Sequence, residues 1–90
     1  MGQMIDVVAE LSRDNPTLRL IDLQLFADAL ATYKEAAKNI KANGSIVMHP
    51  RTGAPIDNPY LKIASSSGAI IGKMGRIKSD RVVTMLDAQG

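Results

Sequence analysis

The densest group of chemically active side chains in this 90-residue sequence is a run of cations near its C-terminal end. Only one carboxylate, Asp80, opposes them over residues 62–81. Clustered cations of this kind bind nucleic-acid phosphates, because neutralising phosphates releases condensed counterions. The same charges could instead balance an acidic surface on a neighbouring protein. The candidate DNA-contacting residues are Lys62, Lys73, Arg76, Lys78 and Arg81.

The charge is also divided unevenly along the chain. Residues 1–32 carry a net charge of −3, whereas residues 33–90 carry +5. A basic half beside an acidic half favours a polyanion or an acidic partner on one face. A solvated surface with uneven charge gives the same pattern, so the charges alone leave both interpretations open.

Two further features imitate catalytic sites without completing them. A phosphate-binding loop needs Gly-x4-Gly-Lys-Ser/Thr after a strand. Around Gly72-Lys73, Ser67 stands where the first glycine belongs and Met74 where the hydroxyl belongs. His49 is the single histidine, cysteine is absent, and the carboxylates are scattered, so no general base or metal site is indicated. We therefore expect no enzyme, no metal and no cofactor.

The apolar periodicity predicts a mostly helical domain. A short helix is expected within residues 1–16, and a long helix within residues 17–44, which ends at Gly44. Apolar residues recur in the long helix at steps of three and four, with a second line beside them that widens the buried face. The first stripe is Leu23, Phe26, Leu30, Tyr33, Ala37 and Ile40, and the second line is Leu25, Ala29 and Ala36.

The period changes after the long helix. Residues 45–57 contain β-forming residues around turn chemistry and predict a small hairpin, in which Pro55 requires an edge strand. Asn58-Pro59 predicts the cap and first position of a second long helix over residues 58–78. A short helix over residues 79–90 completes a single small all-α domain. Its two long helices should be antiparallel, with the hairpin between them. The second long helix should bury Tyr60, Ile63, Ser67, Ile70, Met74 and Ile77.

Small residues at a spacing of four mark a place where helices can approach closely. Ala64, Gly68 and Gly72 lie on one stripe of the second long helix, although each mid-helix glycine costs about 0.8–1 kcal/mol relative to alanine. A core of this size contributes only roughly 3–5 kcal/mol of stability, which favours a homo-oligomer. The candidate residues for helix or subunit packing are Ala64, Gly68, Gly72, Leu23, Phe26 and Leu30.

Two absences concern the location of the chain in the cell. No apolar run approaches the ~18 residues that a membrane span needs. Residues 1–12 lack the basic start of a signal peptide. We therefore expect an intracellular protein without membrane contact.

Residues 18–86 resemble the short terminase small subunits of tailed phages and prophages. The resemblance rests on a long helix that ends in Lys-Ala-Asn-Gly at residues 41–44 and on a hairpin with Arg-Thr-Gly at residues 51–53. Its most specific part is Asn-Pro-Tyr-Leu-Lys-Ile at residues 58–63, which opens an Ala/Ser-rich helix. Ser-Asp-Arg at residues 79–81 fits the start of the family's last short helix.

The resemblance implies a non-enzymatic component of DNA packaging in the cytoplasm of an infected bacterial host. Such proteins recognise double-stranded viral DNA and form ring-like homo-oligomers. They also recruit and regulate the large terminase subunit, which holds the ATPase and the nuclease. Family members often begin with a basic tail, whereas residues 1–32 are acidic here, so the DNA contact is expected on the C-terminal cations. Two alternatives are a small oligomeric helical DNA-binding regulator and a protein-interaction adaptor that binds no DNA.

Overall fold

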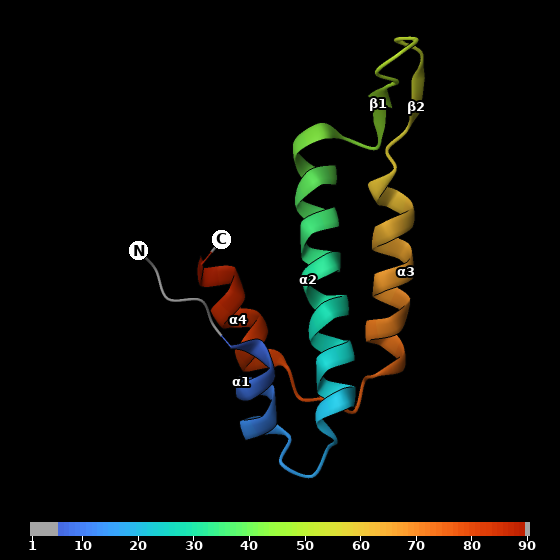
Figure 1. Cartoon of the computed structure of the whole chain (residues 1–90). Coiled ribbons are helices and arrows are strands. Elements are labelled where there is room, and N and C mark those ends of the chain that lie inside the picture. The colour runs from blue at the N-terminus through green and yellow to red at the C-terminus, as the bar shows by residue number, and fades with distance from the viewer. Residues whose placement is uncertain (1–5, 90) are drawn as a thin grey trace.

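The computed structural model describes residues 6–89 as four helices and one two-stranded antiparallel sheet (Figure 1). The class is therefore the expected one, mainly helical with a small hairpin between two antiparallel helices. In the described part of the chain, no helix combines the length and the apolar character that crossing a membrane requires. The elements are α1 (Val7–Asp14), α2 (Leu20–Asn43), β1 (Ile46–Met48), β2 (Pro55–Asp57), α3 (Tyr60–Lys73) and α4 (Asp80–Gln89).

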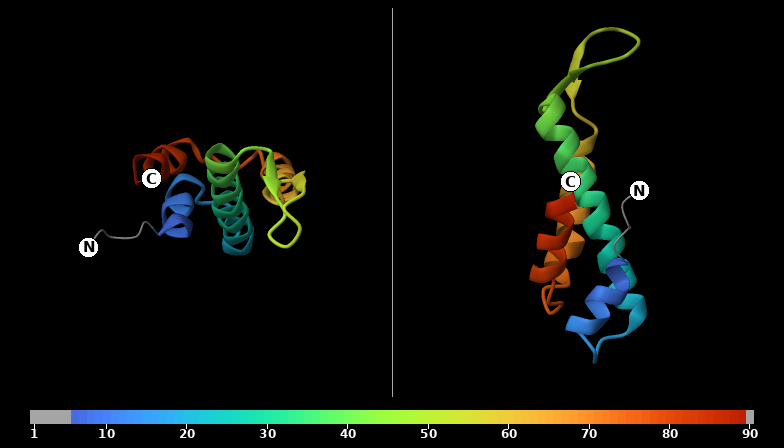
Figure 2. Two further views of the ribbon diagram at one scale, coloured as in Figure 1. Left: turned by 90° about the horizontal axis from the view of Figure 1, so that it is seen from above. Right: turned by 90° about the vertical axis from the view of Figure 1, so that its left-hand side faces the viewer.

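The helices form a flattened slab. Helix α3 runs antiparallel along one flank of α2, and α1 and α4 lie along the other flank (Figure 1). Seen from above, the three groups stand roughly in a row (Figure 2), and the principal extents are 50 × 33 × 18 Å. Because the helices cover one another mainly along their flanks, a broad side of the α2–α3 pair faces solvent.

The core lies where α1 and α4 meet the N-terminal half of α2. Leu23, Phe26 and Leu30 are 0, 2 and 6% exposed, and they pack with residues of α1, α4 and the segment that precedes α4. The second half of the predicted stripe is more open, and Tyr33 is 40% exposed. In the second line, Leu25 is 52% exposed, so the prediction that it is buried was wrong. The core partners of α2 include Leu11, Ile77 and Val82.

Helix α3 ends at Lys73, which is about one turn earlier than predicted. Its last turn closes with the Met74 amide shared between the carbonyls of Ile70 and Ile71. Glycines at positions 72 and 75 weaken any continuation, because glycine has a low helix propensity. The buried side of α3 carries Ser67, whose hydroxyl donates to the carbonyl of Ile63 at 2.6 Å. Two positions of the predicted buried stripe are instead exposed, Ile63 at 37% and Ile70 at 45%.

Asn58 joins α2, the hairpin and α3. Its side-chain oxygen accepts a hydrogen bond from the Tyr60 amide at 2.9 Å, which is the predicted capping contact, and Pro59 has helical dihedral angles. Its side-chain amide donates to Oδ1 of Asn39 at 3.0 Å and to the carbonyl of Gly44 at 2.9 Å. Asn58 is 2% exposed, so one buried carboxamide fixes the exit of α2 and the entry of α3.

Asn15 makes a corresponding junction at the other end of the slab. Its side-chain amide donates to the carbonyls of Leu11 and Lys78, both at 2.9 Å. Its side-chain oxygen accepts from the Lys78 amide at 2.8 Å. These bonds pin the α1–α2 loop to the α3–α4 connection across 63 residues of sequence.

The hairpin pairs Val47 with Ile56, and both residues are half-buried on the same side of the sheet. Its turn is organised by His49, whose Nδ1 accepts from the amides of Arg51 at 3.1 Å and Thr52 at 3.4 Å. Gly53 has a φ of 71°, a conformation that favours glycine. The single histidine therefore has a local structural role in this turn.

Candidate nucleic-acid interface

The five predicted cations occupy three different elements. Lys62 lies in the first turn of α3, and Lys73 is the last residue of that helix. Arg76 and Lys78 lie in the connection to α4, and Arg81 lies in the first turn of α4. Lys62 and Lys73 are eleven positions apart, which is about 16 Å along a helix axis. The structure therefore places Lys73, Arg76 and Lys78 at one end of α3 and Lys62 near the other end.

Arg81 is engaged inside the chain. Its Nη2 lies 2.7 Å from Oε2 of Glu10, and its Nε donates to Oδ2 of Asp14 at 3.1 Å. These hydrogen bonds, first to Glu10 and then to Asp14, raise the pKa of Arg81, so the guanidinium stays charged. Two carboxylates of α1 thus neutralise a cation of α4, and Arg81 orients α4 on α1. Its position makes it a residue of the fold more than a contact for DNA.

The remaining three cations at that end of the slab are open to solvent. Lys73, Arg76 and Lys78 are exposed, and no ion pair found within residues 6–89 involves them. The Asn15–Lys78 bonds also bring the end of α1 to this place. Arg13, whose side chain is 76% exposed, therefore belongs to the same end of the molecule. Sequence reasoning missed Arg13, because it lies in the acidic half and only the folded junction brings it here.

A second basic surface lies between α2 and the end of α4. Lys34, Lys38 and Lys41 follow one another at spacings of four and three along one side of α2. They line an open groove with Tyr33, Glu35, Ala37, Ala42, Leu86 and Asp87. Lys34 forms an ion pair with Asp87 of α4. The sequence had suggested only that these lysines match the dipole of the helix, although their spacing already put them on one side.

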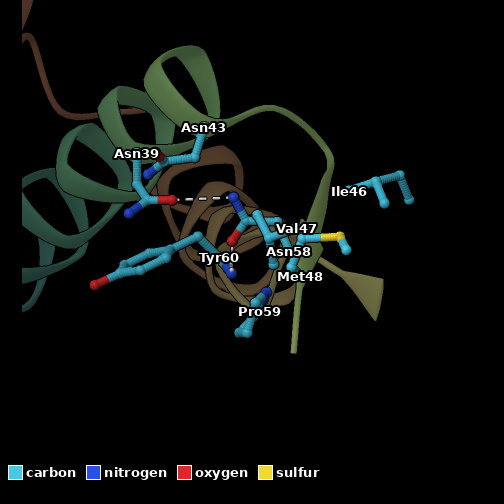
Figure 3. Close-up of a pocket in the computed structure, with 8 residues that line it drawn as sticks. All are labelled: Asn39, Asn43, Ile46, Val47, Met48, Asn58, Pro59 and Tyr60. Atoms are coloured by element: carbon cyan, nitrogen blue, oxygen red, sulfur yellow. Dashed lines mark hydrogen bonds between the residues drawn. The ribbon is translucent and has the colours of Figure 1, made fainter. Parts of the chain in front are cut away.

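The segment that resembles a phosphate-binding loop is helical. Gly68 and Gly72 lie within α3, so their amides belong to the helix and do not form a loop. Another open pocket lies beside Asn58, between the end of α2 and the hairpin (Figure 3). Carboxamides and apolar side chains dominate its lining, and the Tyr60 phenol is its single ionisable group. The lining is Asn39, Asn43, Ile46, Val47, Met48, Asn58, Pro59 and Tyr60.

The small-residue stripe of α3 is used at only one of its two glycines within the chain. A Cβ atom added at Gly68 would lie 3.4 Å from the Tyr33 ring, so the two helices approach each other there. A Cβ atom added at Gly72 would meet nothing within 4 Å. Close packing within the chain therefore involves Gly68, and Gly72 is left as a position for contact with another subunit.

Replacing Gly72 with alanine tests this difference. With open space around it, the added methyl group should stabilise the helix, and we expect the free energy of unfolding to rise by about 0.5–1 kcal/mol. Gly68→Ala is the matched control, and its gain should be smaller because the methyl group crowds Tyr33. Urea titrations of the two variants provide the comparison. A loss of stability in Gly72→Ala would mean that another subunit packs on this position.

A comparison with known families now adds to this geometry. Residues 5–76 match the family described as phage terminase, small subunit. Comparisons with curated proteins and with solved structures give no significant match. The family match spans most of α1 to α3 and includes the hairpin and both asparagine junctions. On this evidence, the chain belongs to the phage terminase small-subunit family.

Proposed function

We propose that this chain recognises double-stranded viral DNA for packaging and recruits the large terminase subunit, which supplies the ATPase and the nuclease. The family match over residues 5–76 is the observation that carries the proposal. In this role the chain is non-catalytic, needs no cofactor and works in the cytoplasm of the infected host as a homo-oligomer, with a ring as the expected form.

The DNA contact of this proposal is the basic end of the slab, formed by Lys73, Arg76 and Lys78. These side chains are exposed and lie within six positions of one another. Lys62, farther along α3, extends the contact in the direction of the hairpin. Phosphate contacts position a protein on DNA without reading its sequence, so this surface provides affinity more than specificity. Several copies in one assembly would multiply a weak affinity per subunit by avidity.

The test compares two double variants that change the charge by the same amount. Arg76→Glu with Lys78→Glu alters the basic end, whereas Lys38→Glu with Lys41→Glu alters the groove between α2 and α4. We expect the first pair to weaken binding to duplex DNA at least about tenfold and to reduce the salt slope by about two, because two phosphate contacts are lost. The second pair should bind with nearly wild-type affinity.

Fluorescence anisotropy at several salt concentrations gives both quantities, and light scattering confirms that the variants keep the wild-type mass. Equal weakening by both pairs would show that only overall charge matters. Weakening by the groove pair alone would move the DNA contact to Lys38 and Lys41. Wild-type binding that does not depend on salt would refute a phosphate contact altogether.

A further inference from the structure

Four large apolar side chains project from the broad side of the α2–α3 pair. In α2, Ile21 is 57% and Leu25 is 52% exposed; in α3, Ile63 is 37% and Ile70 is 45% exposed. The chain has an accessible surface of 6652 Å², which is roughly 1,000 to 1,500 Å² more than a compact monomer of 9.7 kDa exposes. A soluble monomer rarely leaves so much apolar surface in contact with water.

These four residues lie on the same side of the helix pair. On α2, Tyr33 lies to one side of the buried Ala29–Ala36 line, and Leu25 and Ile21 lie to the other side, at about 100° of rotation per residue. On α3, Gly68 and the two isoleucines likewise flank the buried Ser67 on opposite sides. Because Tyr33 contacts Gly68, the other side of α2 and the other side of α3 form one continuous surface. We call Ile21, Leu25, Ile63 and Ile70 the apolar face.

We propose that the apolar face is the docking surface for a second copy of this chain. The inference rests on the proposed homo-oligomer and names the surface through which it forms. One partner contributes about 800 Å² to a standard protein interface, which the excess exposed area of this chain can supply. Leu23, Phe26 and Leu30 cannot form this contact, because they are consumed in the core of the single chain.

The charges at the rims of the apolar face favour a second copy over an unrelated partner. Asp28 lies on the α2 rim, where Gln24 Nε2 donates to its Oδ1 at 2.9 Å, and Lys73 lies on the α3 rim. Since Tyr33 lies beside Gly68 and the helices are antiparallel, Asp28 and Lys73 are level with each other. A two-fold axis that runs along the helices lays α2 of each copy on α3 of the other. Asp28 of one copy then faces Lys73 of its partner, twice per interface.

The first test replaces apolar residues on and off the face. Leu25→Glu and Ile70→Glu should each raise the dissociation constant of the assembly at least about tenfold, because each buries an unpaired charge at the interface. Leu20→Glu is the matched control: Leu20 lies on the same helix and is 64% exposed, but it is turned about 140° away from Leu25. It should leave the mass unchanged. Sedimentation velocity without DNA gives the masses, and circular dichroism verifies that each variant is folded.

The second test reverses the rim charges. Asp28→Lys and Lys73→Asp should each weaken association, and the two changes combined in one chain should restore it, because each pair is then remade with opposite polarity. Failure of the combined variant to recover would overturn the two-fold docking. Wild-type mass in Leu25→Glu and Ile70→Glu would overturn the apolar face but leave the proposed function standing. A monomeric wild-type protein at high concentration would refute both the apolar face and the homo-oligomer.

Discussion

Replacing Phe26 with alanine is expected to lower the free energy of unfolding by about 3–5 kcal/mol, enough to unfold most of a domain this small. Phe26 is 2% exposed in the cluster that joins α1, α2 and α4. Removing its ring leaves a cavity that the two short helices cannot fill. Because the lost contacts lie within one chain, the loss should not depend on protein concentration. Urea titration at two protein concentrations measures both properties.

Two further variants keep this prediction testable if Phe26→Ala does not fold at all. Phe26→Leu conserves most of the volume and should cost less than about 1.5 kcal/mol. Leu20→Ala removes an apolar side chain that is 64% exposed, and it should change stability by less than about 0.5 kcal/mol. If Phe26→Leu were as stable as the wild type when diluted but dissociated the assembly, Phe26 would belong to a subunit interface.

Replacing Asn15 with alanine is expected to cost about 3 kcal/mol, because two partners at Lys78 and one at Leu11 lose their hydrogen bonds near the core. Asn15→Asp should also destabilise, since a carboxylate oxygen would then face the carbonyl of Lys78. The same changes free the segment that carries Arg76 and Lys78, so DNA affinity should fall in parallel. Thermal melts and anisotropy on the same samples measure the two effects.

Asn43→Ala is the control for Asn15, since Asn43 is an exposed asparagine at the end of α2. It should change the free energy of unfolding by less than about 0.5 kcal/mol and leave DNA binding unaltered. An Asn15→Ala protein that melts with the wild type would show that the junction contributes little. If it were destabilised but bound DNA normally while folded, the basic end would not depend on this anchor.

Much of the fold follows from local signals in the sequence. Gly44 marks the end of α2, the Asn58-Pro59 pair caps α3, and the turn chemistry around Gly53 gives the hairpin. Each of these signals acts over a few residues, so no knowledge of distant contacts is needed. Leu23, Phe26 and Leu30 were also identified as packing residues, because a stripe at steps of three and four is visible without the structure.

The features that the sequence did not predict all depend on partners distant in the chain. The burial of Leu25, Ile63 and Ile70 was predicted wrongly, because periodicity shows that a helix has an apolar side but not how many neighbours cover it. Arg81 was grouped with the DNA cations because its carboxylate partners lie about 70 positions earlier, on α1. The early end of α3 likewise depends on Asn15 holding the backbone of Lys78 from the other end of the sequence.

A packaging reaction with purified components tests the central claim most directly. The cognate large subunit, ATP, empty capsids and viral DNA are combined with or without this protein, and the DNA protected from nuclease is measured. We expect the wild-type chain to increase protected viral DNA strongly, and the variant with Arg76→Glu and Lys78→Glu to increase it little, although both have the same mass and fold. Protected DNA that is equally abundant without this chain would contradict its assignment as the DNA-recognising subunit of packaging.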